Sequence, residues 1–242
     1  MDSVNVNERG EEVARIMSKY DLEAIPVIDE IGRLVGRITI DDIVDVIREE
    51  ADKDYQMAAG ISQDVEVSDS IWILTRARLP WLILGLLGGL GAAAIMGTFE
   101  DMISKHAILF FFTPLIAAMA GNVGVQSSAI VVQGLANDDL KGSVRNHLLK
   151  EMLLALLNGL ILAILLLFFT WVWKGTFATA LAISLSLIVV IVVAGFIGTF
   201  VPLFLHKRNI DPAIATGPFI TTSNDIFGIL IYFSIAKIIL GI

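Results

Sequence analysis

The sequence contains no cysteine, only three histidines, and few charged residues for its length. Without cysteine there are no disulfides, thiolate metal ligands or cysteine catalysis. Charged residues make up 17% of the 242 residues and hydrophobic residues 56%, whereas a soluble domain has ~25% charged residues. No basic patch could neutralise phosphates, so we do not expect nucleic-acid binding. HExxH, GxSxG, P-loop and kinase signatures are also missing, so nothing supports an enzyme.

The charges are concentrated in the N-terminal third of the chain. Residues 1–78 contain 18 Asp or Glu and 9 Lys or Arg, whereas residues 79–242 contain 7 and 8. This distribution predicts an acidic, water-exposed head joined to a nearly neutral hydrophobic body. The chain begins without the charged and apolar regions of a signal peptide, so we expect none to be cleaved.

The hydrophobic body contains five runs long enough to cross a bilayer, which needs ~20 apolar residues per helix. Four of these runs are free of Asp, Glu, Lys and Arg, and the fifth follows Asp211 and is interrupted only by Asp225 and Lys237. The first four runs are residues 79–99, 106–137, 152–173 and 175–206. We therefore predict an α-helical membrane protein with five transmembrane helices per subunit.

The positive-inside rule orients these helices, because cytoplasmic loops carry an excess of Lys and Arg. Seven basic residues fall on one side and three on the other. The seven are Arg76, Arg78, Lys141, Arg145, Lys150, Lys207 and Arg208, and the three are Lys105, Lys174 and Lys237. We expect a multi-pass protein of the cell membrane with a cytoplasmic N-terminus and the C-terminus outside.

The acidic head follows the order strand, helix, strand, strand, helix. The expected elements are residues 4–6, 11–20, 24–28 and 33–40, followed by a helix capped by Asp41 or Asp42 with Ile43, Val46 and Ile47 facing inward. With Ala24-Ile25-Pro26-Val27, Gly32 to Gly36 and Thr39 to Asp42, this order resembles a CBS motif. We expect a CBS-type α/β segment at 1–52, a linker with a membrane-surface helix at 53–78, and the five-span domain at 79–242.

The CBS resemblance raises the question of a nucleotide. Gly36, Thr39 and Asp42 match the Gly-x-x-Thr-x-x-Asp pattern with which some CBS domains hold a ribose, so an adenine nucleotide is a possible ligand. The alternative is that Thr39 and Asp42 are only a strand end and a helix cap. CBS motifs work in pairs, so the single copy implies either a missing preceding part, which we expect, or completion by a second subunit.

Asp225 is the least expected residue in the fifth run. Counting from an N-cap at Asp211 and Pro212 places it ~20 Å into the helix, near the bilayer midplane. A carboxylate there costs roughly 2.5–3.5 kcal/mol on insertion scales and normally faces a cavity or a partner. No basic residue lies nearby in the run, so the missing counter-charge is predicted to be a transported cation or a proton. The alternative is a protonated Asp225 bonded to another helix.

Other polar residues support a cation path. Thr221 shares a predicted helical face with Asp225, together with Gly217, Gly228 and Tyr232, and Thr222 is adjacent. Pro218 is expected to open the backbone beside that face. In the second run, Asn122 and Gln126 lie on one face among glycines. Their amides could contact a hydrated ion, although the small residues equally fit close helix packing.

Two long segments are similar to the signature segments of the MgtE magnesium channel and transporter family. They run from Pro114 to Ser127, with Gly121-Asn122-Val-Gly124-Val-Gln126, and from Asp211 to Asp225, with Thr221-Thr222-Ser223-Asn224-Asp225. The resemblance implies a homodimer with five spans per subunit and a cation path along the dimer interface. It also places the family's ion-site aspartate at Asp225. The family's N domain and first CBS motif have no counterpart in this chain.

The expected function is therefore import of hydrated Mg²⁺ down its electrochemical gradient. A carrier coupled to H⁺ or Na⁺ is the alternative, and a CBS-linked scaffold without transport is a further one. We expected an exchanger to show further buried acids or histidines as a relay, and none is evident in the sequence. Selectivity among Mg²⁺, Mn²⁺, Co²⁺ and Ni²⁺ is left open.

Acidic residues gather on the last helix of the head and at the start of the fifth run. They are Asp41, Asp42, Asp45, Glu49, Glu50 and Asp211. Divalent cations could relieve their repulsion, and the resemblance implies that bound intracellular Mg²⁺ favours closure. The alternative is a solvated acidic face.

Overall fold

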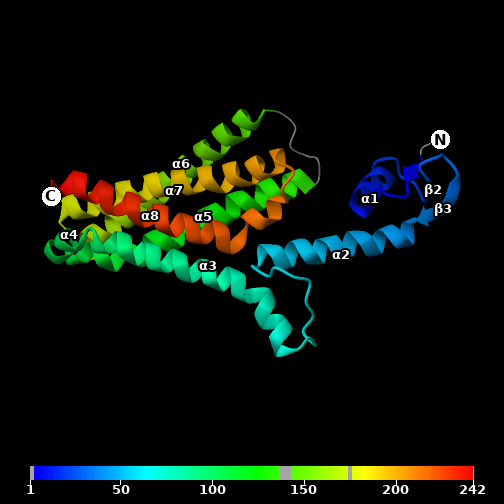
Figure 1. Ribbon diagram of the computed structural model, residues 1–242. Helices are drawn as coiled ribbons and strands as arrows, with labels where there is room; N and C mark the ends of the chain where they lie inside the picture. The colour runs from blue at the N-terminus through cyan, green and yellow to red at the C-terminus, as the bar shows by residue number, and fades with distance from the viewer. Residues whose placement is uncertain (1–2, 137–142, 174–175, 242) are drawn as a thin grey trace. The chain divides into compact units, whose positions relative to one another are not determined.

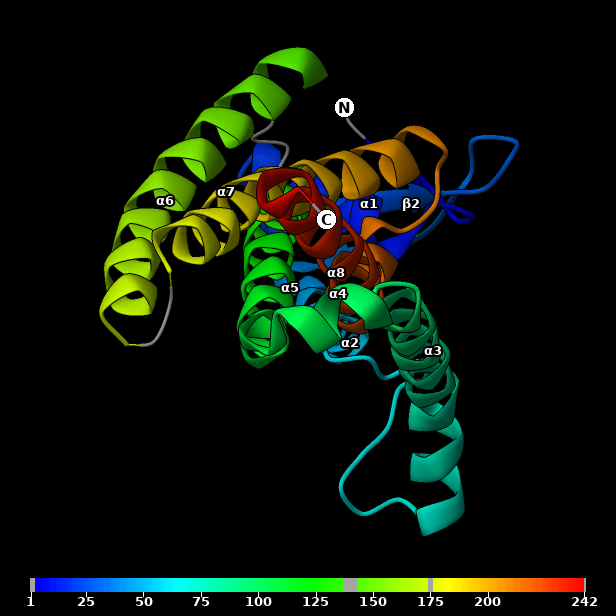
Figure 2. The same cartoon turned by 90° about the vertical axis from the view of Figure 1, so that its left-hand side faces the viewer.

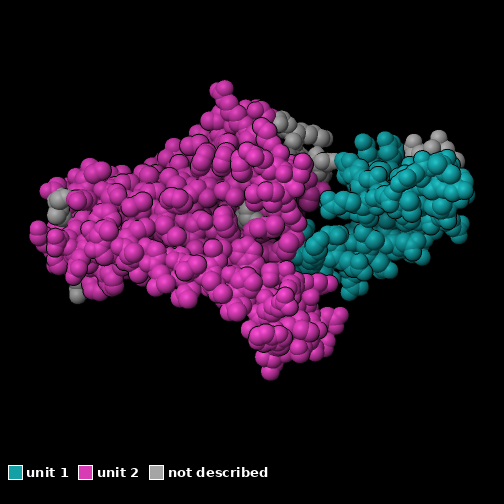
Figure 3. Space-filling view, in the orientation of Figure 1, with its two compact units in different colours: residues 1–56 teal, residues 57–242 magenta. Residues whose placement is uncertain are grey.

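The computed structural model describes residues 3–136, 143–173 and 176–241, and the chain divides into two compact units. Figure 3 colours these units, which comprise residues 1–56 and 57–242. Two basic residues used to orient the spans, Lys141 and Lys174, lie outside the described residues.

The first unit is a three-stranded sheet with helices. It contains β1 (Val4–Asn5), α1 (Gly10–Lys19), β2 (Ala24–Ile28), β3 (Leu34–Thr39) and most of α2 (Ile40–Ala58). The strand order is β1-β2-β3, with β1 parallel to β2 and β2 antiparallel to β3. A parallel pair needs a crossover connection, and α1 supplies it. The predicted order of elements is confirmed.

The core of this unit comes from one apolar face of each element. Val13 and Met17 of α1, Ile25 of β2 and Ile43 of α2 are each at most 2% exposed. The prediction that Ile47 also faces inward is wrong, because its side chain is 50% exposed. Ile47 is not among the apolar residues that pack in this core.

Among its described residues, the second unit contains five helices that are long and apolar enough to cross a membrane, which agrees with the predicted number. These helices are α3 (Ile71–Gly97), α5 (Ala107–Ala136), α6 (Val144–Trp173), α7 (Phe177–Lys207) and α8 (Gly217–Leu240). The short helix α4 (Glu100–Lys105) connects α3 to α5, and the 3-10 helix η1 (Pro212–Ala215) precedes α8.

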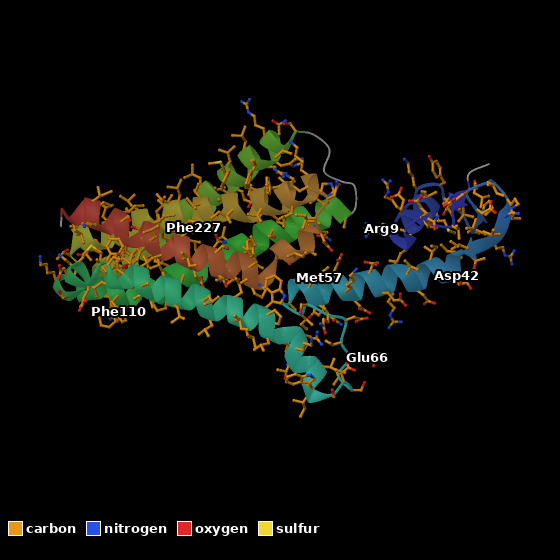
Figure 4. All side chains as sticks on the ribbon, in the orientation of Figure 1. Arg9, Asp42, Met57, Glu66, Phe110 and Phe227 are labelled. Carbon is orange, nitrogen blue, oxygen red and sulfur yellow. The ribbon has the colours of Figure 1, made fainter. Side chains whose placement is uncertain are left out.

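Helices α5, α6 and α8 pack around α7, and α3 packs against α8. Figure 2 shows α3 and α6 at opposite edges of the group, with α5, α7 and α8 between them. Ile183, Leu187 and Ile191 of α7 are at most 2% exposed. Apolar side chains such as Phe110 and Phe227, labelled in Figure 4, are exposed on the outside of α5 and α8. Helices that are apolar on all sides suit a membrane, where lipid covers the outer faces.

The ends of the spans follow local signals in the sequence. Ser70 precedes α3 and accepts a hydrogen bond from the Ile73 amide, and Thr176 accepts one from Thr179 at the start of α7. Gly241 ends α8 with φ +68°, the left-handed conformation that glycine adopts without cost.

The first span begins earlier than the sequence predicted. The residues expected to form a separate surface helix, 70–79, are continuous with α3, which includes Pro80. Figure 1 shows the α3 ribbon changing direction after its first turns. A proline inside a helix removes one backbone hydrogen bond and allows such a bend.

Candidate ion pathway

One cavity of the transmembrane unit lies between α5 and α8 and collects most of the polar residues predicted for ion contact. Its volume is about 460 Å³, and we call it the polar hollow. Asn122 and Gln126 of α5 and Thr221 and Asp225 of α8 supply its polar groups. The remaining lining residues are Ala117, Ala118, Gly121 and Val125.

The polar hollow is found on an outer face of the subunit. Ala118, Asn122 and Gln126 are spaced four residues apart on α5, so they lie on one face of the helix, and all three are exposed. Ser127, the next residue along the chain, is only 3% exposed. The polar face of α5 therefore points out of the bundle.

Asp225 is partly exposed in this hollow and has no basic partner. Within the described ranges 3–136, 143–173 and 176–241, no Lys or Arg forms an ion pair with its carboxylate. Gly121 of α5 lies opposite, where a Cβ would be 3.7 Å from the Asp225 Oδ1 and 3.2 Å from the Thr221 methyl. Glycine at this position keeps the space beside the carboxylate open.

The position predicted for Asp225 along its helix is wrong, because the helix begins later than Asp211. Asp211 instead caps η1, where its Oδ1 accepts a hydrogen bond from the Ala213 amide at 2.9 Å. Helix α8 starts at Gly217, so Asp225 lies eight residues further, ~12 Å along the axis. Asp225 therefore lies in the first half of this 24-residue helix.

The start of α8 is closely approached by the end of α2. Gly217 has φ +50°, and a Cβ on it would overlap the carbonyl oxygen of Ala58. Pro218 packs against Gly60 and occupies the first turn of α8, where a missing amide proton costs nothing. The prediction that Pro218 opens the backbone is therefore wrong. The Gly217 carbonyl accepts a hydrogen bond from the Thr221 hydroxyl at 3.0 Å.

Thr222 does not line the polar hollow. It faces α3, where a side chain on Gly88 would overlap its methyl group. Gly228 and Tyr232, which share the predicted face of Asp225, are buried in the bundle. The Tyr232 hydroxyl donates to the Leu109 carbonyl oxygen at 2.9 Å. Of the residues predicted to share one face of α8, Thr221 and Asp225 line the polar hollow, whereas Gly228 and Tyr232 pack α8 against its neighbours.

Asn224 is a polar residue that the sequence analysis did not single out. It is 1% exposed, and neither atom of its amide has a hydrogen-bond partner. A Cβ on Gly124 of α5 would overlap this amide, and a Cβ on Gly198 of α7 would overlap the Gly124 backbone. Three helices thus meet closely beside Asp225. Gly124 indicated a close helix contact in the sequence, but the sequence does not identify which helices it contacts.

The residues predicted to hold a nucleotide lie at the junction of β3 and α2, where Figure 4 labels Asp42. The Asp42 Oδ2 accepts hydrogen bonds from the Thr39 amide at 3.0 Å and the Thr39 hydroxyl at 2.8 Å. The backbone bond from Thr39 is the main cause that lowers the pKa of Asp42. Helix α2 begins at Ile40, so Asp42 is its third residue and not its N-cap. From this position its carboxylate accepts the hydrogen bond of the Thr39 amide just before the helix. Gly36 has open space beside it.

The acidic residues predicted as a regulatory site lie along α2 and before η1. Asp41, Asp45 and Glu49 are exposed, and Glu50 is partly buried and pairs with Lys53 at 3.4 Å. Among the residues that the structure describes, no three or more His, Cys, Asp or Glu form a group that could hold a metal ion.

Comparisons with known proteins agree with the two parts of the chain. The divalent cation transporter family MgtE matches residues 113–235, and the CBS domain family matches residues 2–49. A protein of Bacillus subtilis named magnesium transporter MgtE is 39% identical over 227 residues, covering 93% of this chain and 50% of the relative. Proteins of the same name from Enterococcus faecalis and Thermus thermophilus are 38% and 35% identical. These two alignments cover 97% and 95% of this chain and 52% of each relative. The chain spans about half the length of these relatives.

Proposed function

The chain belongs to the MgtE family of divalent cation transporters, and from this membership we propose that it forms a channel that imports Mg²⁺ down its electrochemical gradient. The observation that carries this proposal is the unpaired Asp225 carboxylate in the polar hollow. A buried carboxylate without a protein counter-charge is costly in a membrane, and a transported cation offsets that cost when it passes.

The composition of the polar hollow suits a hydrated Mg²⁺ ion. Mg²⁺ requires near-octahedral oxygen geometry and gives up its waters reluctantly. The hollow offers one carboxylate, from Asp225, and the oxygens of Thr221, Asn122 and Gln126. So sparse a ligand set fits contact through the ion's water shell. Thr222 belongs to this proposal only as a residue that supports α8 from the side of α3.

The conducting form is proposed to be a homodimer. Asn122 and Gln126 are exposed on a face of a membrane-spanning helix, and amides that face lipid lose their hydrogen bonds to water. A second copy related by a two-fold axis would cover this face and place two Asp225 carboxylates beside one path. The lipid bilayer then contacts the remaining apolar faces.

The driving force needs no coupled ion. A divalent cation that moves inward gains ~4.6 kcal/mol per 100 mV of inside-negative potential. This proposal includes the orientation derived from basic residues, with the N-terminus in the cytoplasm and the C-terminus outside. It also includes the cell membrane as the location.

One observation favours a second candidate, a carrier coupled to protons. No relay of further buried acids is evident in the sequence, but the partly buried Glu151 lies inside α6 and is hydrogen-bonded to Ser127 of α5. A proton carrier requires a titratable group of this kind. Uptake of Mg²⁺ into liposomes with a pH dye inside separates the two functions, since only the carrier moves protons in proportion to Mg²⁺.

The CBS segment is proposed to regulate the pore. Cations that bind the acidic face of α2 and Asp211 would relieve repulsion between like charges and favour a closed state. An adenine nucleotide is the proposed ligand of Gly36, Thr39 and Asp42, whose last two side chains lie in contact. Millimolar Mg²⁺ should protect residues 51–78 from proteolysis, and exchange of Asp45 and Glu49 for Ala should remove the protection.

The test of the transport proposal is uptake of Mg²⁺ by liposomes that contain the purified chain and a Mg²⁺ indicator. We expect uptake to increase with an inside-negative potential and to compete with other divalent cations. A chain that is folded in the liposomes and gives no more uptake than empty liposomes would refute the proposal.

A further inference from the structure

Glu151 is a carboxylate that stands at the edge of the third apolar run and lies within helix α6. It is the eighth residue of the 30-residue α6 and is partly buried. The Ser127 hydroxyl donates a hydrogen bond of 2.5 Å to its Oε1. Acidic residues inside membrane helices are costly and usually have a defined partner. Here that partner comes from α5, the helix that lines the polar hollow.

Three helices meet at this hydrogen bond. Gly195 of α7 lies beside it, where a Cβ would be 3.7 Å from both the Glu151 Oε1 and the Ser127 Oγ. One turn further along α6, the Cβ of Ala155 is 3.2 Å from the same position. Small residues therefore let α7 approach closely and enclose the bond. Both α5 and α6 pack along α7, and the bond joins the two directly.

The bond is made by the side of α5 that faces away from the polar hollow. Successive residues of a helix point ~100° apart, so Ser127 faces the bundle while its neighbour Gln126 faces the polar hollow. Asn122 lies one turn before Gln126 on the exposed face. A rotation that broke the bond to Glu151 would also turn both amides away from Asp225.

We propose that Glu151 is a positioning residue of the ion pathway, which acts through Ser127 to hold α5 in the rotation that presents Asn122 and Gln126 to the polar hollow. Glu151 acts here as a hydrogen-bond acceptor for Ser127, so the amide oxygen of a glutamine can replace the carboxylate oxygen. This inference rests on the proposed function, because it assigns the amides a role in ion contact.

The flux experiment compares variants in the liposome assay with both Mg²⁺ and Co²⁺. Glu151→Leu and Ser127→Ala each remove the bond, and we expect each to change the ratio of Mg²⁺ to Co²⁺ uptake by about fivefold. The double variant should be no worse than Glu151→Leu, because both changes remove one interaction. A merely structural role would lower uptake of both ions by the same factor and leave the ratio unchanged.

Two further variants complete the comparison. Glu151→Gln keeps an acceptor for Ser127, and we expect it to stay within about twofold of the wild-type ratio. If Glu151 instead bound cations or carried protons, Gln would be as damaging as Leu, and this result would overturn the proposal. The control is Thr170→Val, because Thr170 is also buried on α6 and its hydroxyl has no partner.

A labelling experiment tests the rotation without relying on flux. The chain has no native cysteine, so Ala118→Cys places one thiol on the exposed, hollow-lining face of α5. We expect the rate of reaction with a water-soluble thiol reagent to change several-fold in the Glu151→Leu background and to stay unchanged with Thr170→Val. Equal rates in all three backgrounds would refute the positioning role. Absence of wild-type Mg²⁺ uptake would refute the proposed function, with the labelling result still reporting on the rotation.

Discussion

Replacing Asp225 with Asn isolates the charge that the polar hollow offers to a cation. Asn has nearly the same size and keeps an oxygen acceptor, so the cavity beside Gly121 should persist. The variant removes a carboxylate that costs roughly 2.5–3.5 kcal/mol to insert into a bilayer. We therefore expect the protein to fold and to form the same oligomer, with stability equal to or above that of the wild type.

The expected loss of transport follows from Coulomb's law. A hydrated Mg²⁺ centred ~5 Å from the carboxylate is attracted by about 6–7 kcal/mol at an effective dielectric constant of ~20. The Asn dipole and the retained water shell replace part of this attraction. A loss of one third of this attraction is about 2 kcal/mol. Mg²⁺ uptake should then fall about 30-fold, because 1.4 kcal/mol corresponds to a factor of ten.

The assay is Mg²⁺ uptake into liposomes at a fixed inside-negative potential, normalised to folded protein. The matched control is Asp101→Asn, which makes the same chemical change at an exposed residue in the first turn of α4. We expect the control to keep wild-type uptake. Unchanged uptake in the Asp225 variant would mean that the carboxylate has a structural role and that the cation passes elsewhere.

Three other outcomes follow from the packing and the hydrogen bonds. Gly124→Ala should destabilise the protein by ~1–3 kcal/mol through overpacking, seen as a lower midpoint of thermal unfolding, whereas Gly85→Ala, with open space beside it, should not destabilise. Tyr232→Phe should cost ~0.6–1.7 kcal/mol in the same measurement, and an unchanged midpoint would show that the hydroxyl contributes nothing. Because Thr39 lowers the pKa of Asp42, this carboxylate stabilises the fold above pH ~4, and the contribution is lost as the pH falls through its lowered pKa. Asp42→Asn should therefore flatten the acid limb of the full-length unfolding profile, and identical profiles would contradict this cause.

The number of candidate spans could be predicted because it depends only on length and hydrophobicity. A run of ~20 apolar residues predicts a membrane-spanning helix, whichever other helices it packs against. The order of elements in the head was also predictable, since periodicity and turn residues report on local structure. Ile47 shows the limit of this reasoning, because an apolar residue is buried only where another element covers it, and Ile47 is exposed.

The arrangement of the candidate site could be predicted only in part. The spacing of Thr221 and Asp225 on one face was sufficient to bring both to the polar hollow. The late start of α8 was not predictable from Asp211 and Pro212, because the cap and proline signals at these residues begin the separate 3-10 helix η1. Glu151 was missed for a similar reason, since a charged residue at the edge of an apolar run reads as the end of a span.

The central claim is that this chain conducts Mg²⁺ passively, and the most direct measurement is the reversal potential of the current in a planar bilayer with Mg²⁺ as the permeant cation. Two charges gain ~4.6 kcal/mol per 100 mV and a tenfold gradient is worth 1.4 kcal/mol, so the potential should shift by ~30 mV for each tenfold change in the Mg²⁺ gradient. The shift should be the same with and without a gradient of pH or Na⁺. A reversal potential that follows pH or Na⁺, or the absence of any current from the folded chain, would contradict the account.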